Sequence, residues 1–182
     1  MIIRRIFRKN PHEKAIESLY AQIMTQARLP VFYEVYKIPD TLDGRFDVLA
    51  LHVFLVVHRL RDELDKEEIV RQLPEKMLGE IDRALRENGV SDMGVPRRVK
   101  TMAKAFLGRA TAYENALQSD EANDLVAALA RNVFPGQDPD KAEIRYLAGY
   151  MRACETHLAT LNTDSICTGS VSFPDPGATY AD

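Results

Sequence analysis

Apolar side chains are densest between residues 44 and 63, where the sequence reads GRFDVLALHVFLVVHRLRDE. On a helix that turns by 100° per residue, these apolar positions cover nearly the whole circumference, which is typical of a helix surrounded by other helices. Asp47, His52 and His58 interrupt the run, which therefore falls short of the about 20 apolar residues that span a bilayer. We predict an all-α domain packed around a buried central helix at about residues 44–63.

Basic side chains interrupt this helix at a regular spacing. Arg45, His52 and Arg59 recur every seven residues, and a step of seven returns to within about 20° of the same face. A polar row on an apolar helix needs water, a carboxylate or a partner. The spacing predicts a narrow polar seam and leaves open whether that seam faces solvent or core.

Amphipathic patterns on both sides of this run predict further helices. They cover about residues 10–28, 75–88, 95–117, 121–133 and 138–158. We expect Pro74 to divide the region after the central helix, and the aromatic-rich stretch between Pro30 and Pro39 to form a short helix or an irregular connection. Gly108, in the middle of a predicted helix, costs about 1 kcal/mol relative to Ala, which predicts that another backbone crosses closely there.

A chain of 182 residues suits one compact domain. We expect a basic N-terminal arm at residues 1–9 and a multi-helix domain at residues 10–162. Ser, Gly and Pro accumulate after residue 162, so residues 163–182 are expected to be an irregular tail, extended or partly disordered. The arm mixes Ile and Phe with Arg and Lys, and it either contacts an anionic membrane surface or packs on the domain.

Charge and cysteine content narrow the classes of protein. The net charge of −3 argues against a general nucleic-acid binder. Two cysteines are too few for a disulfide framework, and this low number fits a reducing cytoplasm. The N-terminus has no apolar region of the kind that follows the basic residues of a secretory signal. We expect a cytoplasmic protein whose contact with a membrane, if it has one, is peripheral.

The common catalytic motifs are absent from the sequence: it has no glycine-rich phosphate loop, no H-E-x-x-H, no C-x-x-C and no G-x-S-x-G. Cys154 and His157 supply only two ligands, too few for a structural zinc site. His52 and His58 point about 120° apart on one helix, so either could be only a single axial ligand, and a hydrogen-bonded core histidine is favoured. We therefore predict no enzyme activity, no metal and no cofactor.

Basic residues also gather on the helix predicted at residues 95–117. Arg97, Lys100 and Lys104 share the side opposite the apolar face, and Arg98 and Arg109 share a flank. Such a stripe suits an acidic protein surface, lipid phosphates or RNA, or it is simply a solvated face. No aromatic residues are interleaved with it, so base stacking is not supported.

Two stretches taken together resemble one known family. LDGRFDVLALHVFLVVHRLRDE and, further along, GVSDMGVPRRVKTMAKAFLGRATAYENAL are similar to the ubiquinol-cytochrome c chaperone family. Its members are bacterial relatives of mitochondrial chaperones that assist cytochrome b and the assembly of the bc1 complex. The resemblance covers roughly residues 11–154 and leaves out the tail beyond Asn162.

The resemblance assigns signature positions to both stretches. In the first stretch they are Leu42, Asp43, Gly44, Arg45, Phe46, Asp47 and His52. In the second they are Asp92, Gly94, Val95, Pro96, Arg98, Val99, Lys100, Met102, Phe106, Gly108, Arg109 and Tyr113. Leu107 departs from the family pattern, in which a Tyr is expected, so no role can be given to a hydroxyl at that point.

The resemblance implies an assembly chaperone that binds cytochrome b or another bc1 subunit at the cytoplasmic membrane face. We expect the client to contact a basic surface of Arg97, Arg98, Lys100, Lys104 and Arg109. A surface that binds a protein client needs neither a nucleophile nor a metal, which agrees with the absence of catalytic motifs.

Two alternatives stay open. In the first, the chain is a small-molecule-binding module of respiratory metabolism. A pocket between the central helix and the 95–117 helix then holds a quinone, a lipid or a haem next to His52, Arg45 or Arg109. In the second, the chain is a purely structural oligomer whose basic stripe is solvated.

Overall fold

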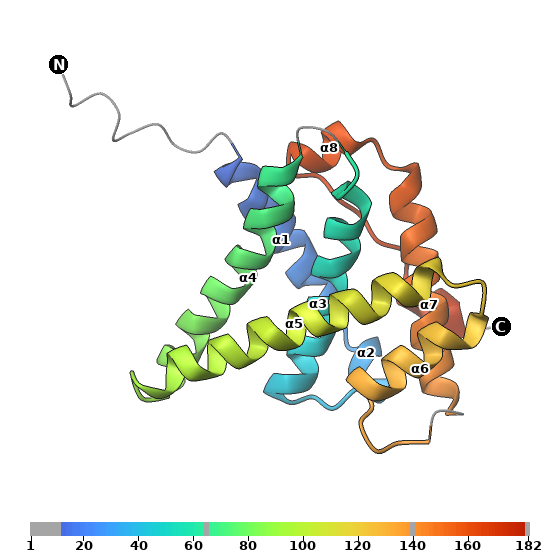
Figure 1. The fold of residues 1–182 in the computed structure, drawn as a ribbon, viewed down its shortest axis with the longest axis horizontal. Helices are drawn as coiled ribbons and strands as arrows, with labels where there is room; N and C mark the ends of the chain where they lie inside the picture. Colours follow the sequence, from blue (N-terminus) through green and yellow to red (C-terminus); the bar gives the residue numbers. More distant parts are fainter. Residues whose placement is uncertain (1–11, 64–65, 139–140, 181–182) are drawn as a thin grey trace.

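The computed structural model describes residues 12–63, 66–138 and 141–180, so the predicted basic arm at residues 1–9 lies outside the described residues. The described residues form helices and no strand, which confirms the all-α prediction (Figure 1). The helices are α1 (Glu13–Ala27), α2 (Val31–Glu34), α3 (Leu42–Leu60), α4 (Glu67–Glu87), α5 (Gly94–Gln118), α6 (Ala122–Asn132), α7 (Ala142–Thr160), α8 (Thr163–Cys167) and the 3₁₀-helix η2 (Pro176–Tyr180).

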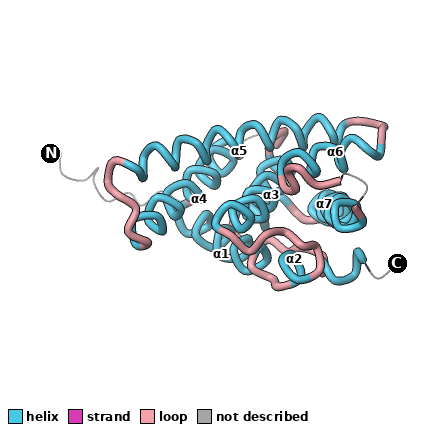
Figure 2. The backbone as a smooth tube through the Cα atoms, turned by 90° about the horizontal axis from the view of Figure 1, so that it is seen from below, coloured by secondary structure: helices cyan, strands magenta, loops and turns pink. Residues whose placement is uncertain are grey.

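Helix α3 carries the apolar run from which the fold was predicted. Every residue from Phe46 to Val56 is buried, and the helix contacts α1, α4, α5 and α7. Figure 2, which shows the molecule from below relative to Figure 1, shows α3 between these helices. The helix begins at Thr41, whose Oγ1 accepts a hydrogen bond from the backbone N–H of Gly44 at 3.1 Å, as is usual for an N-cap. A helix with no free face explains why the apolar residues show no amphipathic period.

The prediction that Pro74 ends or divides a helix is wrong. Helix α4 runs without interruption from Glu67 to Glu87 with Pro74 inside it. Pro74 removes one helical hydrogen bond, which disfavours a helix locally. The inward face of α4 nevertheless continues on both sides of it, since Leu73 and Met77 are fully buried. Packing of one continuous apolar face against α1, α3 and α5 outweighs the local preference.

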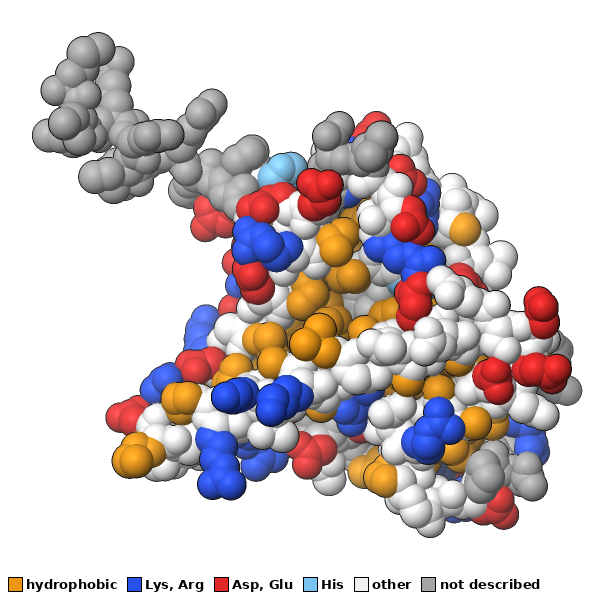
Figure 3. Space-filling view, in the orientation of Figure 1, with side chains coloured by type: hydrophobic (Ala, Val, Ile, Leu, Met, Phe, Trp, Pro, Cys, Tyr) orange, Lys and Arg blue, Asp and Glu red, His pale blue; other side chains and the backbone are white. Residues whose placement is uncertain are grey.

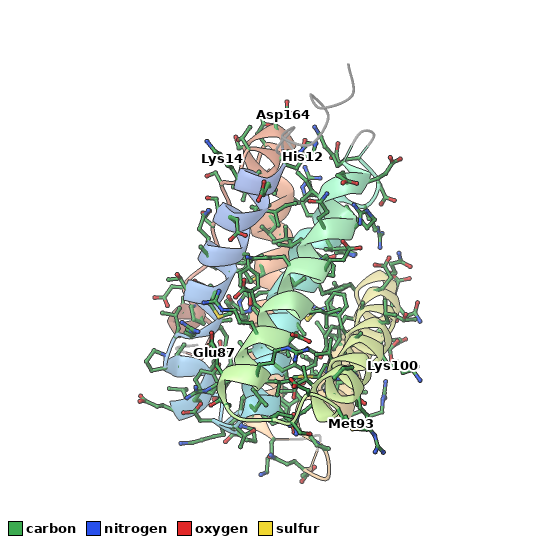
Figure 4. All side chains as sticks on the ribbon, turned by 90° about the vertical axis from the view of Figure 1, so that its left-hand side faces the viewer. His12, Lys14, Glu87, Met93, Lys100 and Asp164 are labelled. Atoms are coloured by element: carbon green, nitrogen blue, oxygen red, sulfur yellow. The ribbon has the colours of Figure 1, made fainter. Side chains whose placement is uncertain are left out.

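The segment that follows α7 differs from the predicted irregular tail. It contains α8 and η2, and it buries Ile166, Val171 and Pro176. Ser18 and Gln22 of α1 both donate side-chain hydrogen bonds to the carbonyl oxygen of Gly169, each at 2.7 Å. Figure 4 labels Asp164 of α8 close to His12 and Lys14, at the start of α1. Helix α8 and the residues directly after it are therefore packed against α1.

Glycines at residues 44 and 108 have opposite surroundings. A Cβ added at Gly44 would collide with the backbone carbonyl of Pro39, so the connection from α2 to α3 passes too close for any side chain. At Gly108 a Cβ would meet no atom within 4 Å. The close crossing of another backbone at Gly108 is therefore not present among the described residues, and the prediction is wrong for the chain by itself.

We expect Gly108→Ala to stabilise the protein by about 1 kcal/mol and to raise Tm by about 2–4 °C, because Ala reduces the entropy of the unfolded helix segment and meets open space. Gly44→Ala serves as the contrasting variant and should destabilise by about 1–3 kcal/mol through its clash with Pro39. Thermal unfolding followed by circular dichroism measures both. A lower Tm for Gly108→Ala would show that the site is not open.

Candidate functional site

The outer face of α5 presents the basic stripe. Arg97, Lys100 and Lys104 are exposed, and none of them has an ion pair with the described residues. Figure 4 shows Lys100 directed away from the helix bundle. Figure 3 shows Lys and Arg side chains along the N-terminal half of α5, beside a hollow lined with hydrophobic side chains between α4 and α5. Cations without acidic neighbours leave this face positively charged.

Arg98 lies beside the stripe and links α5 to the beginning of α3. Its Nη2 lies 3.3 Å from Oδ1 of Asp43, and both side chains are largely exposed. Exposed ion pairs of this kind contribute about 0–1 kcal/mol. Arg98 therefore remains accessible to a partner at small cost.

Arg109, predicted as part of the basic client-binding surface, lies away from the basic stripe. Its side chain is only 17% exposed, and its Nη2 lies 2.7 Å from Oδ1 of Asp47. Nη2 also donates a hydrogen bond to the carbonyl oxygen of Asn132 at 3.2 Å, at the end of α6. The guanidinium lies over the ring of Phe46, 5.5 Å from its centroid. Arg109 thus joins α3, α5 and α6, and a change to Glu would press two carboxylates together.

The ion pair of Asp47 and Arg109 lies in a buried polar cluster that also includes Tyr113. Among the described residues, Oδ1 of Asp47, Nε of Arg109 and the hydroxyl of Tyr113 are buried without an aligned hydrogen-bond partner. Burial raises the pKa of Asp47 to about 6; Arg109 opposes this rise, and nearby Asp43 adds to it. Burial also raises the pKa of Tyr113. Sequence spacing could not reveal this cluster, because its members come from two helices.

Three further signature positions of α5, Gly94, Phe106 and Gly108, have different surroundings. Gly94 is its first residue, and a Cβ there would lie 3.1 Å from Oγ of Ser91. Phe106 is buried and packs into the core. Gly108 and its neighbour Leu107 lie on the opposite side, where Leu107 is 64% exposed.

The residues of the predicted polar seam have three separate surroundings rather than one. Arg45 is exposed and pairs with Asp40, with 2.6 Å between Nε and Oδ1. At the other end of α3, Arg59 donates from Nε to the carbonyl oxygen of Leu158 at 3.0 Å and thereby caps the end of α7. His52, between them, is fully buried. The seam is therefore not a continuous surface.

His52 forms the centre of a buried hydrogen-bond network. Its Nδ1 lies 2.7 Å from the carbonyl oxygen of Val48, which can only accept, so Nδ1 carries the proton. The hydroxyl of Tyr150 donates to Nε2 at 2.8 Å and accepts from Nε2 of Gln26 at 2.9 Å. The ring of Phe173 from the C-terminal segment lies edge-on to His52, with centroids 5.0 Å apart. Both ring nitrogens are occupied, so His52 acts as a structural residue.

The described residues bear on the kind of site to expect. They contain no group of three or more His, Cys, Asp or Glu side chains placed to hold a metal ion. Within the same residues, no helix combines the length and the apolar character that crossing a membrane requires.

The sequence model of the family described as "Ubiquinol-cytochrome C chaperone" matches residues 34–173. The chain belongs to this family. The family match extends past residue 154, where the resemblance was expected to end, and includes α8 and the segment up to Phe173. The part of the C-terminal segment up to Phe173 thus lies within the family match.

Individual proteins support the family assignment. The chain is 28% identical over 142 residues to ubiquinol-cytochrome-c reductase complex assembly factor 1 of Xenopus laevis, a match that covers 77% of this chain and 70% of that protein. The Drosophila melanogaster assembly factor 1 is 25% identical over 177 residues, with coverages of 90% and 68%. Among solved structures, the crystal structure of the Cbp3 homolog from Brucella abortus superposes with a TM-score of 0.82 at 33% identity, over 92% of each chain.

We expect the Asp47 carboxyl to make the free energy of unfolding of this chaperone-family domain fall as pH rises from about 4 to about 6. Its pKa is about 6 in the folded protein and near 3.8 otherwise, so in this window the folded state holds a proton that the unfolded state has released. The size is up to about 3 kcal/mol. Denaturant unfolding of Asp47→Asn at several pH values should lack this component, and an unchanged pH slope would contradict the assignment.

His52 should behave in the opposite sense. Burial lowers its pKa to about 4, so between about pH 4 and 6.5 only the unfolded state takes up the proton, and this group lowers stability as pH falls. In the folded protein we expect the His52 imidazole to stay neutral at pH 5. Nuclear magnetic resonance of the ring carbons, assigned with His52→Gln, measures this directly. A His52 signal that titrates near pH 6.5 would show that the ring is hydrated.

Proposed function

We propose that this chain is an assembly chaperone of the ubiquinol–cytochrome c reductase (bc1) complex, which binds cytochrome b or another subunit before that subunit joins the complex. The observation that carries this proposal is the family match over residues 34–173, together with relatives named as assembly factors of this complex. The described residues add no metal cluster that would favour catalysis over binding.

The client surface that we propose is the outer face of α5, with Arg97, Arg98, Lys100 and Lys104 as its charged part. The structure gives three of these cations no acidic partner among the described residues, so they are free to meet carboxylates of a client. Leu107, exposed on the same helix, supplies an apolar contact. Arg109 contributes indirectly, because its pairing with Asp47 holds α5 against α3.

Gly108 supports this choice of face. A glycine in the middle of a helix costs about 1 kcal/mol relative to Ala, and nothing among the described residues needs the space above it. A client backbone that packs closely against α5 would need that space. The crossing that the sequence predicted within the chain is then made by the client.

The hollow between α4 and α5 is the apolar part of the proposed surface (Figure 3). Hydrophobic side chains line this hollow in Figure 3. A membrane subunit that has not yet met its partners exposes apolar segments, and covering such a segment removes its unfavourable contact with water. Basic residues beside an apolar hollow match a client that is apolar with acidic flanks.

We further propose that the protein acts in the cytoplasm at the inner face of the membrane, where the client is inserted. The basic and apolar arm at residues 1–9, which lies outside the described residues, is suited by composition to anionic lipid. Each basic residue close to such a surface contributes about 1 kcal/mol. Binding would therefore be peripheral and sensitive to salt.

The first test measures cytochrome b and bc1 activity in a strain that lacks this protein. We expect its membranes to lose cytochrome b absorbance and bc1 activity while transcripts of the complex remain normal, and the intact chain should restore both. Normal bc1 content in the deleted strain would overturn the proposed function.

The client surface is tested by charge reversal on α5. We expect Lys100→Glu with Lys104→Glu to fold normally but to lower recovery of bc1 activity and co-purification of cytochrome b by about tenfold, because repulsion replaces attraction. The matched control is Lys14→Glu with Arg145→Glu, which changes net charge equally at two exposed cations on α1 and α7 that have no ion pair within the described structure. If both double variants rescue alike, the client binds elsewhere.

A further inference from the structure

A second concave region lies on the side of α4 that faces α1, away from the hollow between α4 and α5. It is a pocket of about 550 Å³, formed by the end of α1, the beginning of α3 and the C-terminal half of α4. Figure 4 labels Glu87, one of its lining residues, at the end of α4 on the side toward α1. Of the three residues named for a pocket in the sequence analysis, Arg45 lines this pocket, whereas His52 and Arg109 do not.

The floor of the pocket is apolar. Phe46 and Leu49 of α3, Ile81 of α4 and Met102 of α5 line it, and each is less than a tenth exposed. Leu42, at the first turn of α3, lines the same pocket and is 46% exposed. A pocket of this volume lies within the range that binds small organic ligands, about 300–1,000 Å³.

The rim of the pocket is rich in arginine. Arg28 from the end of α1, Arg45 from α3 and Arg83 from α4 all line it. Arg28 has no ion pair with any residue that the structure describes. An adjoining hollow of about 470 Å³ shares Arg45 and adds Arg98. Three guanidinium groups, those of Arg28, Arg45 and Arg83, therefore line one pocket with an apolar floor, and that of Arg98 lines the hollow beside it.

Acidic residues at the rim do not cancel this charge. Of the two acidic residues in the lining, Glu87 pairs with Arg83 at 3.0 Å, and Glu80 lies 2.8 Å from Lys76 and 4.0 Å from Arg83. Asp40, which lines the adjoining hollow, pairs with Arg45 at 2.6 Å. The pairs of Arg45 and Arg83 are exposed, and exposed pairs contribute only about 0–1 kcal/mol. Both arginines can turn to a bound anion at little cost, and Arg28 needs to give up no ion pair among the described residues.

We propose that this pocket binds an anionic amphiphile, a lipid-like molecule whose acyl chain lies on the apolar floor and whose carboxylate or phosphate contacts Arg28, Arg45 and Arg83. Arginine suits such head groups because its planar fork donates two parallel hydrogen bonds to a pair of oxygens. A neutral head group would offer the three guanidinium groups no negative charge, and an anion without an acyl chain would leave the apolar floor exposed to water. The inference does not rest on the proposed function.

The test uses the purified, delipidated full-length chain and cis-parinarate, a fatty acid that fluoresces when it leaves water. We expect saturable binding at one site, displaced by dodecanoate and by dodecyl phosphate. The tighter of these two competitors identifies the head group as carboxylate or phosphate. Dodecanol should displace at least about tenfold less well, and inorganic phosphate should not displace at all.

Two variants locate the site. Arg28→Gln with Arg83→Gln should weaken cis-parinarate binding by about tenfold or more, whereas Lys14→Gln with Arg145→Gln should leave it unchanged. Ala84→Leu, which fills a position that lines both hollows, should block binding without a change in charge. Circular dichroism confirms folding, and the arginine variant decides the question if Ala84→Leu does not fold.

Several results would overturn the inference. They are the absence of saturable binding, equal displacement by dodecanol and dodecanoate, displacement by inorganic phosphate alone, or unaltered binding by the Arg28 and Arg83 double variant. None of these results bears on bc1 content in the deleted strain, so this inference and the proposed function fail separately.

Discussion

Burial of α3 from Phe46 to Val56 is the constraint on which the rest of the structure depends. A helix with apolar residues on every side cannot be covered by one neighbour, so α1, α4, α5 and α7 all contact it. Its few polar side chains must then find partners inside the protein. His52 does so through Val48 and Tyr150, and Asp47 does so through Arg109. These two solutions tie α3 to α7 and to α5.

Patterns within one helix were predictable from the sequence, whereas relations between helices were not. The run from Phe46 to Val56 and the amphipathic repeats predicted an all-α fold with most helix positions correct to within a few residues. Pro74 was misleading because local preference yields to packing on both sides of it. Arg109 was misleading because a helical wheel locates its flank but not the carboxylate of Asp47 on another helix. The arginine-rimmed pocket is lined by residues from α1, α2, α3, α4 and α5, and no spacing within one stretch could reveal it.

The sequence alone does not separate two groups of cations in this protein, those bound within the fold and those exposed without an ion pair. Arg59 and Arg109 are used internally, where they bind helix-end carbonyls and carboxylates. Lys100 and Lys104 lie in the open with no ion pair to the described residues. Burial is what distinguishes them, because a buried guanidinium must satisfy its donors within the fold while an exposed ammonium is satisfied by water. Exposed cations such as these are accessible to another molecule, and so are exposed arginines whose ion pairs are weak.

The C-terminal segment also affects the order in which the protein folds. Gly169 accepts hydrogen bonds from Ser18 and Gln22, and Pro176 accepts one from Tyr36, so residues about 140–150 positions apart in the sequence complete the same core. Contacts of such long range form late, because the intervening chain must first be ordered. The ring contact of Phe173 with His52 belongs to the same set, so the core around α3 closes only when this C-terminal segment docks on it. A protein in a family of chaperones therefore keeps part of its own apolar core uncovered until a late step of its folding.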